Sequence, residues 1–176
     1  MPTFFTIGHS NRALDAFIAI LRDAGVDTIV DVRTVPRSRG NPQFNADTLP
    51  AALAACGIDY VHLRDLGGLR GRQRTGAPSP NGFWENVSFR NYADYAMSEP
   101  FRSGLQTLRS LGETRRCAIM CAEAVWWRCH RRIIADYLIA AGETVLHILG
   151  TGRIEPARMN LAARRGPAGS LIYQSE

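Results

Sequence analysis

Five short apolar runs, separated by segments of helical periodicity, constrain the fold of this chain more than any other feature. The runs cover residues 3–7, 28–32, 59–62, 117–121 and 144–148, and each contains adjacent apolar residues instead of a strict alternation with polar ones. Continuous apolar strands are typical of parallel sheets whose two faces are both covered by helices. We therefore predict an α/β fold: a single three-layer domain with a mainly parallel sheet of about five strands and helices on both faces.

Helical periodicity fills the segments between these runs. Leu14, Phe17, Ile18 and Leu21 recur at the spacing of one helix face, and Gly25 marks the end of that helix. Further helices are predicted over residues 50–56, 89–97, 101–111 and 129–141.

The length of 176 residues fits one domain. We predict the α/β domain over residues 1–150 and an Arg/Gly/Pro-rich tail over residues 151–176, which is expected to be loosely ordered. The segment Leu66–Gly82 is rich in glycine, proline and arginine. Loops of this length inside compact domains are usually functional.

Targeting signals are not evident in the sequence. The N-terminal residues lack the basic and apolar regions of a signal peptide, and no window of about 18 residues is continuously apolar. We therefore expect a cytoplasmic protein with no membrane partner. In that compartment the four cysteines are expected to be thiols or metal ligands, not a disulfide framework.

The net charge of +5 comes entirely from arginine, because the chain has 21 arginines and no lysine. The arginines are spread along the chain, and their densest runs are short. This distribution favours a small anionic substrate as the partner and leaves nucleic acid as an alternative. The sequence does not predict the oligomeric state.

Polar motifs follow four of the predicted strands. They are Gly8–Asn11, Asp31–Arg39, His62–Gly68 and Cys121–Glu123. The carboxyl ends of parallel strands meet at one edge of a sheet, where α/β folds bind their ligands. The sequence therefore predicts that these motifs converge on one site.

The richest of these motifs is CAEAVWWRCHRR, which begins at Cys121. We predict Cys121 as a nucleophile whose thiol pKa is lowered by a following helix N-terminus and by nearby arginines. Glu123 or His130 is the predicted proton carrier, and Cys129 belongs to the same catalytic group. The competing interpretation makes Cys121 an inert buried cysteine and His130 a core residue.

Substrate binding is assigned to residues that offer backbone N–H groups or fixed positive charge. The turn GHSN suits an anion at a helix N-terminus, arginines can grip carboxylate or phosphate, and LGGLRG could form a basic flap. The predicted substrate-binding residues are Gly8, His9, Ser10, Asn11, Asp31, Arg33, Arg37, Gly67, Gly68, Arg70 and Arg131.

No metal and no cofactor are predicted. Cys121, Cys129 and His130 with His9 would supply four zinc ligands, but their spacing is not that of structural zinc sites. A redox pair of Cys121 and Cys129 is another alternative, although the spacing differs from Cys-x-x-Cys.

The segments TIGHSN, DVRTVPRSR, LGGLRG and CAEAVWWRCHRRIIADYL together resemble the family known as domain of unknown function 488. The resemblance extends to about Ile148 and implies an α/β domain without a settled reaction. The segment TIVDVR also resembles a strand of rhodanese-like sulfurtransferases, which carry a catalytic cysteine in a strand-to-helix loop. Glu123 would repel an anionic sulfur donor there, so this second resemblance stays local. The positions of this sequence that match the signature of the first family are Gly8, His9, Ser10, Asp31, Arg33, Pro36, Gly67, Gly68, Cys121, Glu123, Cys129, His130 and Arg131.

Three functions follow from these observations. The favoured one is a thiol-dependent enzyme, of transferase or hydrolase type, that uses Cys121 with His130 or Glu123 on a small anionic or nucleotide-like substrate. The first alternative is a nucleic-acid or nucleotide-binding module in which Trp84, Trp126 and Trp127 stack on bases and the cysteines are structural. The second alternative is a thiol redox or metal sensor.

Overall fold

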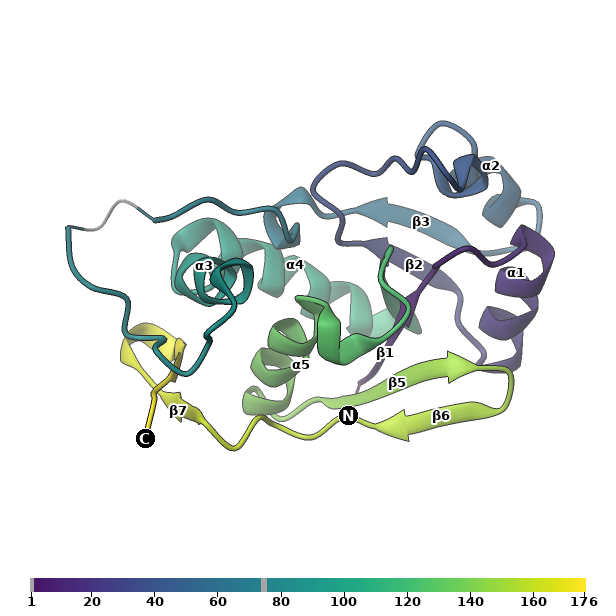
Figure 1. The fold of residues 1–176 in the computed structure, drawn as a ribbon. Helices are drawn as coiled ribbons and strands as arrows, with labels where there is room; N and C mark the ends of the chain where they lie inside the picture. Colours follow the sequence, from purple (N-terminus) through teal and green to yellow (C-terminus); the bar gives the residue numbers. More distant parts are fainter. Residues whose placement is uncertain (1, 74–75) are drawn as a thin grey trace.

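The computed structural model describes residues 2–73 and 76–176, so residues 74 and 75 of the segment Leu66–Gly82 lie outside the described residues. Its centre is a six-stranded sheet in the order β3-β2-β4-β1-β5-β6 (Figure 1). The first five strands of that order pair in parallel, and β6 pairs antiparallel with β5. The mainly parallel sheet is confirmed, with one strand more than expected. The strands are β1 (Thr3–Gly8), β2 (Thr28–Asp31), β3 (Asp59–His62), β4 (Cys117–Cys121), β5 (Thr144–Gly150) and β6 (Arg153–Pro156).

Helices cover both faces of the sheet, which confirms the three-layer α/β architecture (Figure 1). Because side chains alternate along a strand, Phe4 and Phe5 of β1 enter different cores. Phe5 packs with α1 and α2, whereas Phe4 packs with α3, α4 and α5. The helices are α1 (Leu14–Asp23), α2 (Leu49–Ala54), α3 (Val87–Tyr95), α4 (Glu99–Thr114) and α5 (Arg131–Ala140), and single 3-10 turns span Pro42–Phe44, Arg64–Leu66, Trp126–Arg128 and Pro167–Gly169.

None of the helices in the described part of the chain is long and apolar enough to cross a lipid bilayer.

The parallel register brings the predicted motifs to one edge of the sheet. Gly8 at the end of β1 lies beside Cys121 at the end of β4. Asp31 at the end of β2 lies between Met120 and His62 of its two neighbouring strands. The chain segments that follow these strands therefore start side by side.

Residues 151–176, which the sequence predicts as a loosely ordered tail, contain paired strands and buried side chains. After β6, the strands β7 (Ala163–Arg165) and β8 (Leu171–Tyr173) form a two-stranded sheet. Tyr173 is fully buried, and its hydroxyl donates a hydrogen bond to Asp136 Oδ2 at 2.8 Å. Composition does not indicate these contacts, because only a few apolar residues of the segment, such as Tyr173, make them.

Candidate functional site

Two thiols meet at the carboxyl edge of the sheet. Cys121 is the last residue of β4, and Cys129 follows the short turn Trp126–Arg128. Their Sγ atoms lie 2.6 Å apart, and the two residues are only 3% and 5% exposed. The helix predicted from Cys129 begins at Arg131, so Cys121 is followed by a loop and not by a helix N-terminus.

A close approach of backbones holds this loop against β1. A Cβ atom on Gly8 would lie 1.7 Å from the carbonyl oxygen of Glu123, so only glycine fits. The backbone N–H groups of His9 and Ser10 donate to the carbonyls of Cys121 and Ala122 at 2.9 and 3.0 Å. Gly8 is thus a packing requirement of the thiol loop.

Arg131 is the only described charged group in direct contact with both sulfurs. Its Nε lies 3.0 Å from Cys121 Sγ and 3.4 Å from Cys129 Sγ. Its Nη1 donates to Thr6 Oγ1 at 3.1 Å, and its Nη2 donates to the Glu123 carbonyl at 2.7 Å. The residue is 1% exposed, so its guanidinium faces these buried groups and not solvent.

Arg131 has no carboxylate partner among the ion pairs of the described residues. A guanidinium stays protonated in proteins, and a buried charge requires a counter-charge. The thiol pair is the acidic group within reach of Arg131 Nε. The geometry therefore favours one thiolate in the pair as the counter-ion.

The two thiols differ in their electrostatics. Burial opposes ionisation of Cys129, but the hydrogen bond from Cys121 and the nearby His130 and Arg131 lower the pKa of Cys129 well below its ordinary value. Burial raises the pKa of Cys121 well above its ordinary value, and Cys129 adds to that shift. These shifts favour Cys129 as the ionised member of the pair, whereas the sequence predicts a lowered pKa for Cys121, the sulfur nearer to Arg131 Nε.

His130 is oriented toward the Cys129 thiolate. Its Nε2 donates to the Val32 carbonyl at 2.9 Å, which leaves Nδ1 at 3.5 Å from Cys129 Sγ. Tyr92 packs edge-on against the ring at 4.9 Å between centroids. A Cβ atom on Gly68 would lie 2.4 Å from His130 Nδ1, so the glycine allows the loop to pass over the imidazole. His130 therefore lies within the site, as predicted.

His9, Asp31 and Arg33 form a buried framework beside the thiols. Both carboxylate oxygens of Asp31 accept hydrogen bonds from Arg33, at 2.9 and 2.7 Å, and Arg33 Nη2 also donates to the Phe44 carbonyl at 2.7 Å. His9 Nδ1 donates to the Ser10 carbonyl at 2.8 Å, and its Nε2 accepts from Arg33 Nη1 at 3.3 Å. Burial lowers the pKa of His9. The side chains of His9, Asp31 and Arg33, which were predicted to bind substrate, thus bind one another and the backbone.

In the predicted basic flap, Gly68 and Leu69 line the thiol pocket, but Arg70 lies outside its lining. Arg70 lies over the ring of Tyr95 at 3.9 Å and donates from Nε to the Gly67 carbonyl at 2.9 Å. A Cβ atom on Gly67 would lie 2.5 Å from Thr34 Oγ1. Arg70 and Gly67 therefore hold this loop in place and do not reach toward the sulfurs.

A pocket of about 480 Å³ opens above the thiols. Cys121, Cys129 and His130 belong to its lining, together with Arg37 and Arg128. Arg37 and Arg128 are exposed and make no side-chain hydrogen bond or ion pair to the described parts of the chain. Their charges are thus available to a ligand.

Glu123 lines the same pocket, and its side chain is exposed. Its Oε1 accepts a hydrogen bond from the backbone of Val125 at 3.4 Å. Ser10 and Asn11 lie apart, in a shallower pocket of about 340 Å³ that also includes His9 and Glu123. The structure therefore places the predicted turn beside the thiol pocket and not inside it.

Two residues behind the site, connected to it through Arg131, were missed from the sequence. Thr6 accepts from Arg131, and its Oγ1 lies 2.6 Å from His147 Nδ1. Burial lowers the pKa of His147 to about 4. The available signal was a polar residue inside each of two apolar strands, where parallel sheets seldom carry one without a partner.

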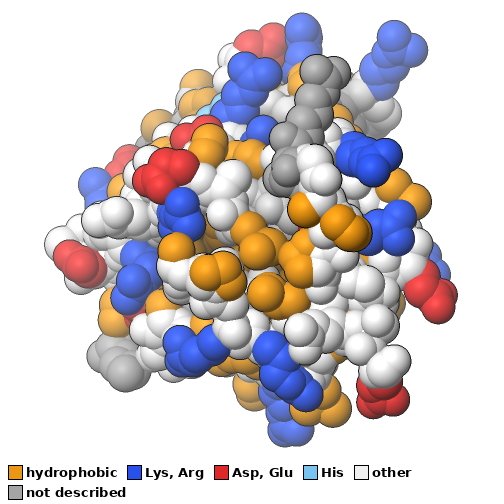
Figure 2. Space-filling model, turned by 90° about the vertical axis from the view of Figure 1, so that its left-hand side faces the viewer, with side chains coloured by type: hydrophobic (Ala, Val, Ile, Leu, Met, Phe, Trp, Pro, Cys, Tyr) orange, Lys and Arg blue, Asp and Glu red, His pale blue; other side chains and the backbone are white. Residues whose placement is uncertain are grey.

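The tryptophans are arranged differently from the stacking platform predicted for nucleic acid. Trp84 is 5% exposed and lies in the core, and Trp126 stacks on His147 at 4.6 Å. Trp127 is 46% exposed. On the face shown in Figure 2, arginine side chains are spread around a group of hydrophobic ones and do not form a continuous stripe.

His9, the fourth ligand of the zinc alternative, does not present a free ring nitrogen. Both ring nitrogens of His9 are engaged within the protein. Within residues 2–73 and 76–176, no group of three or more His, Cys, Asp and Glu side chains is arranged to hold a metal ion.

The fold and the site define a class: a three-layer α/β domain with a two-thiol centre at the carboxyl edge of its parallel sheet. The chain belongs to the family described as Domain of unknown function DUF488, whose family model matches residues 13–138. The match includes both thiols and Arg131, and it begins after Gly8 and His9. No curated protein and no solved structure matches the chain significantly.

Proposed function

We propose that this protein is a thiol-dependent enzyme that acts on a small anionic substrate, with Cys129 as the nucleophile. The observation that carries the proposal is the buried Arg131 guanidinium, which faces two thiols at 3.0 and 3.4 Å and has no carboxylate partner in the described chain. The thiolate is the nucleophilic form of cysteine, and a cation beside it makes that form available at neutral pH.

The remaining groups have defined roles in such a reaction. The Cys129 sulfur forms a bond to an electrophilic carbon or phosphorus atom of the substrate while the bond to the leaving group breaks. In its imidazolium form, His130 gives the proton on Nδ1, 3.5 Å from that sulfur, to the leaving group, and the neutral ring later takes a proton from the water that cleaves the sulfur–substrate bond. Cys121 donates its S–H to the thiolate and so holds it in place.

The charge of the pocket selects the substrate class. Arg37 and Arg128 line the pocket without partners among the described residues, while the thiols lie at its buried end. An anionic group bound by these arginines places the rest of a small molecule against Cys129.

Alkylation by two reagents that differ only in charge tests this proposal. Iodoacetate is an anion, and iodoacetamide is its neutral analogue. For each cysteine we take the ratio of its iodoacetate rate to its iodoacetamide rate. We expect this ratio to be about tenfold higher at Cys129 than at the half-buried Cys56. The rates are measured by mass spectrometry of peptides at several pH values.

Arg37→Gln and Arg128→Gln should each lower this ratio, whereas Arg39→Gln, an exposed neighbour outside the pocket lining, should leave it unchanged. Equal ratios at Cys129 and Cys56 in the wild-type protein would contradict the proposed anion site. An alkylation rate at Cys129 no greater than that at Cys56 would remove its role as a nucleophile.

The sulfur–sulfur distance of 2.6 Å favours a second candidate function, reversible thiol oxidation. Hydrogen peroxide would take two electrons and two protons from Cys121 and Cys129, which forms one disulfide and two waters. Mild peroxide treatment followed by thiol counting tests it. Loss of two thiols in the wild-type protein, but not in Cys121→Ser, supports the redox function, and retention of all four thiols contradicts it.

A further inference from the structure

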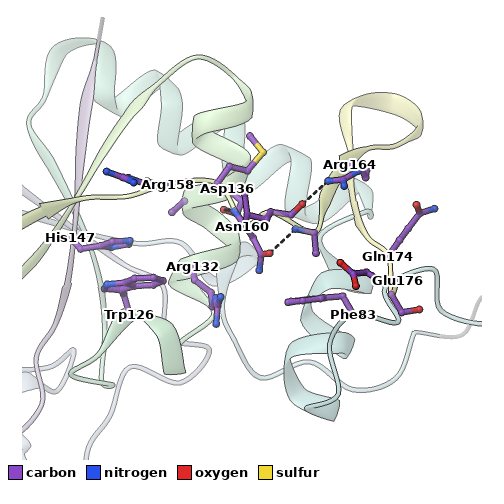
Figure 3. A pocket seen from close by; sticks show the side chains of 15 residues that line it. Phe83, Trp126, Arg132, Asp136, His147, Arg158, Asn160, Arg164, Gln174 and Glu176 are labelled. Atoms are coloured by element: carbon purple, nitrogen blue, oxygen red, sulfur yellow. Dashed lines mark hydrogen bonds between the residues drawn. The ribbon is translucent and has the colours of Figure 1, made fainter.

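A second pocket, of about 610 Å³, shares no lining residue with the thiol pocket. Its walls come from α5, β5 and the C-terminal residues 158–164 and 174–176 (Figure 3). The rings of His147 and Trp126 lie parallel at one end of the pocket, and Arg164 and Glu176 lie at the other (Figure 3). The thiol mechanism uses neither end.

The hydrogen bonds around Thr6 fix the tautomer of His147. Arg131 Nη1 donates to Thr6 Oγ1, so the oxygen already accepts one hydrogen bond. The hydroxyl proton of this fully buried threonine needs an acceptor, and His147 Nδ1 lies 2.6 Å away. Thr6 therefore donates to Nδ1, and the ring carries its own proton on Nε2.

His147 Nε2–H has no hydrogen-bond partner among the described residues. His147 is 2% exposed, yet it lines the pocket, so its donor faces this space. Burial holds the ring in the neutral form and lowers its pKa to about 4. A donor at the end of a buried chain of hydrogen bonds is a built feature that calls for an acceptor in the pocket.

Two arginines, Arg132 and Arg158, line the same pocket as this donor. Arg158 is exposed and has no partner among the described residues, and Arg132 donates only to the Trp127 carbonyl at 3.1 Å. Neither arginine forms an ion pair within the described chain. The Asp136 carboxylate is engaged, because it accepts from the Asn160 backbone at 3.0 Å and from a tyrosine hydroxyl. At the His147 end the free groups are thus donors and cations, whereas the exposed Glu176 carboxylate lies at the opposite end.

We propose that this pocket binds a small organic oxyanion, a carboxylate or a phosphate monoester, through His147 Nε2–H, Arg132 and Arg158. Phe83, which is 40% exposed, and Met159 line the same pocket and receive the apolar part of the ligand. This inference does not depend on the thiol chemistry, since no residue of the thiol pocket contributes to it.

Calorimetric titration of the full chain with phenyl phosphate and with benzoate tests the proposal, with benzyl alcohol as the neutral control. We expect at least one of the two anions to bind and the alcohol not to bind. His147→Asn keeps an acceptor for Thr6 but removes the donor at the Nε2 position, whereas His147→Gln keeps a donor there. His147→Asn should therefore weaken binding by about tenfold or more, and His147→Gln should largely retain it.

Arginine variants supply the matched control. Arg158→Gln should weaken anion binding by about tenfold, while Arg153→Gln, an exposed arginine on β6 outside the pocket, should leave it unchanged. Equal weakening by both variants would show non-specific attraction and overturn the proposal, as would the failure of both anions to bind. Cys129→Ser should bind the anions like the wild-type protein, so this result is separate from that of the thiol proposal.

Discussion

At the residue scale, Arg131 is the charged group in contact with both thiols. It is almost fully buried, and its guanidinium contacts both sulfurs, the Thr6 hydroxyl and a backbone carbonyl. A cation in this position stabilises a thiolate far more than one in water, because the surrounding dielectric is low. Removing the cation should therefore change both reactivity and stability.

Arg131→Met tests this role. Without the cation, the pKa of Cys129 should rise, so that alkylation at neutral pH slows by about tenfold or more. Unfolding in urea should show a loss of about 3 kcal/mol, because Thr6 and the Glu123 carbonyl lose their donors. Arg153→Met on exposed β6 is the control, and an unchanged alkylation profile in Arg131→Met would exclude the counter-ion role.

His147 should make stability depend on pH. Its ordinary pKa is 6.5, and burial lowers the value in the folded protein to about 4. Between these values the unfolded chain binds a proton that the folded chain does not, so stability falls as the pH falls. We expect the wild-type protein to lose up to about 3 kcal/mol relative to His147→Gln between neutral pH and about pH 4. Urea unfolding at several pH values measures it, and parallel curves for the two proteins would contradict it.

At the element scale, the loop between β4 and α5 converts a sheet edge into a site. Its backbone carbonyls accept from His9 and Ser10, and its path depends on the missing side chain of Gly8. The sequence predicts this loop as the reactive segment because two cysteines and a histidine are close together there. It did not reveal which thiol ionises, since that depends on how the loop folds back.

Gly8→Ala should disrupt this element. The added methyl group would overlap the Glu123 carbonyl, so we expect a loss of about 3 kcal/mol or more in unfolding free energy and slower alkylation of Cys129. Gly150→Ala is the matched control, because a Cβ there meets no atom within 4 Å among the described residues. Equal stability of the two variants would show that the loop does not need the close approach.

The strands and the helix start illustrate what sequence periodicity can predict. Continuous apolar runs are a local signal, and they located β1 to β5 and the edge where their polar residues meet. The start of α5 was placed two residues early, at Cys129, because helical spacing does not show where the first turn closes. The inward orientation of Arg131 and the Thr6–His147 contact depend on tertiary packing between strands, which no local pattern encodes.

At the scale of the whole molecule, the C-terminal residues complete the domain. β6 extends the sheet, and Tyr173 on β8 packs against α5 through Asp136. The backbone N–H of Tyr173 also donates to Asn81 Oδ1 at 2.9 Å, which connects the C-terminal segment to the residues before α3. The composition of the tail suggested loose order, because it does not reveal these long-range contacts.

Tyr173→Ala should therefore destabilise the whole domain. Loss of a fully buried aromatic side chain costs about 3 kcal/mol or more, and the Asp136 carboxylate would lose a donor. Removing residues 174–176, which are exposed, should change the unfolding free energy little. If urea unfolding shows the two variants to be equally stable, the C-terminal segment is not part of the cooperative domain.

The most direct test of this account is an ultraviolet titration of thiolate absorbance, in a Cys56→Ser/Cys117→Ser background that retains only the two thiols of the site. The account predicts one thiolate already present at neutral pH, which disappears in Cys129→Ser, and a second that forms only at high pH. If both thiols ionise only at or above the ordinary cysteine pKa, the buried Arg131 is not balanced by a thiolate and the proposed centre is wrong.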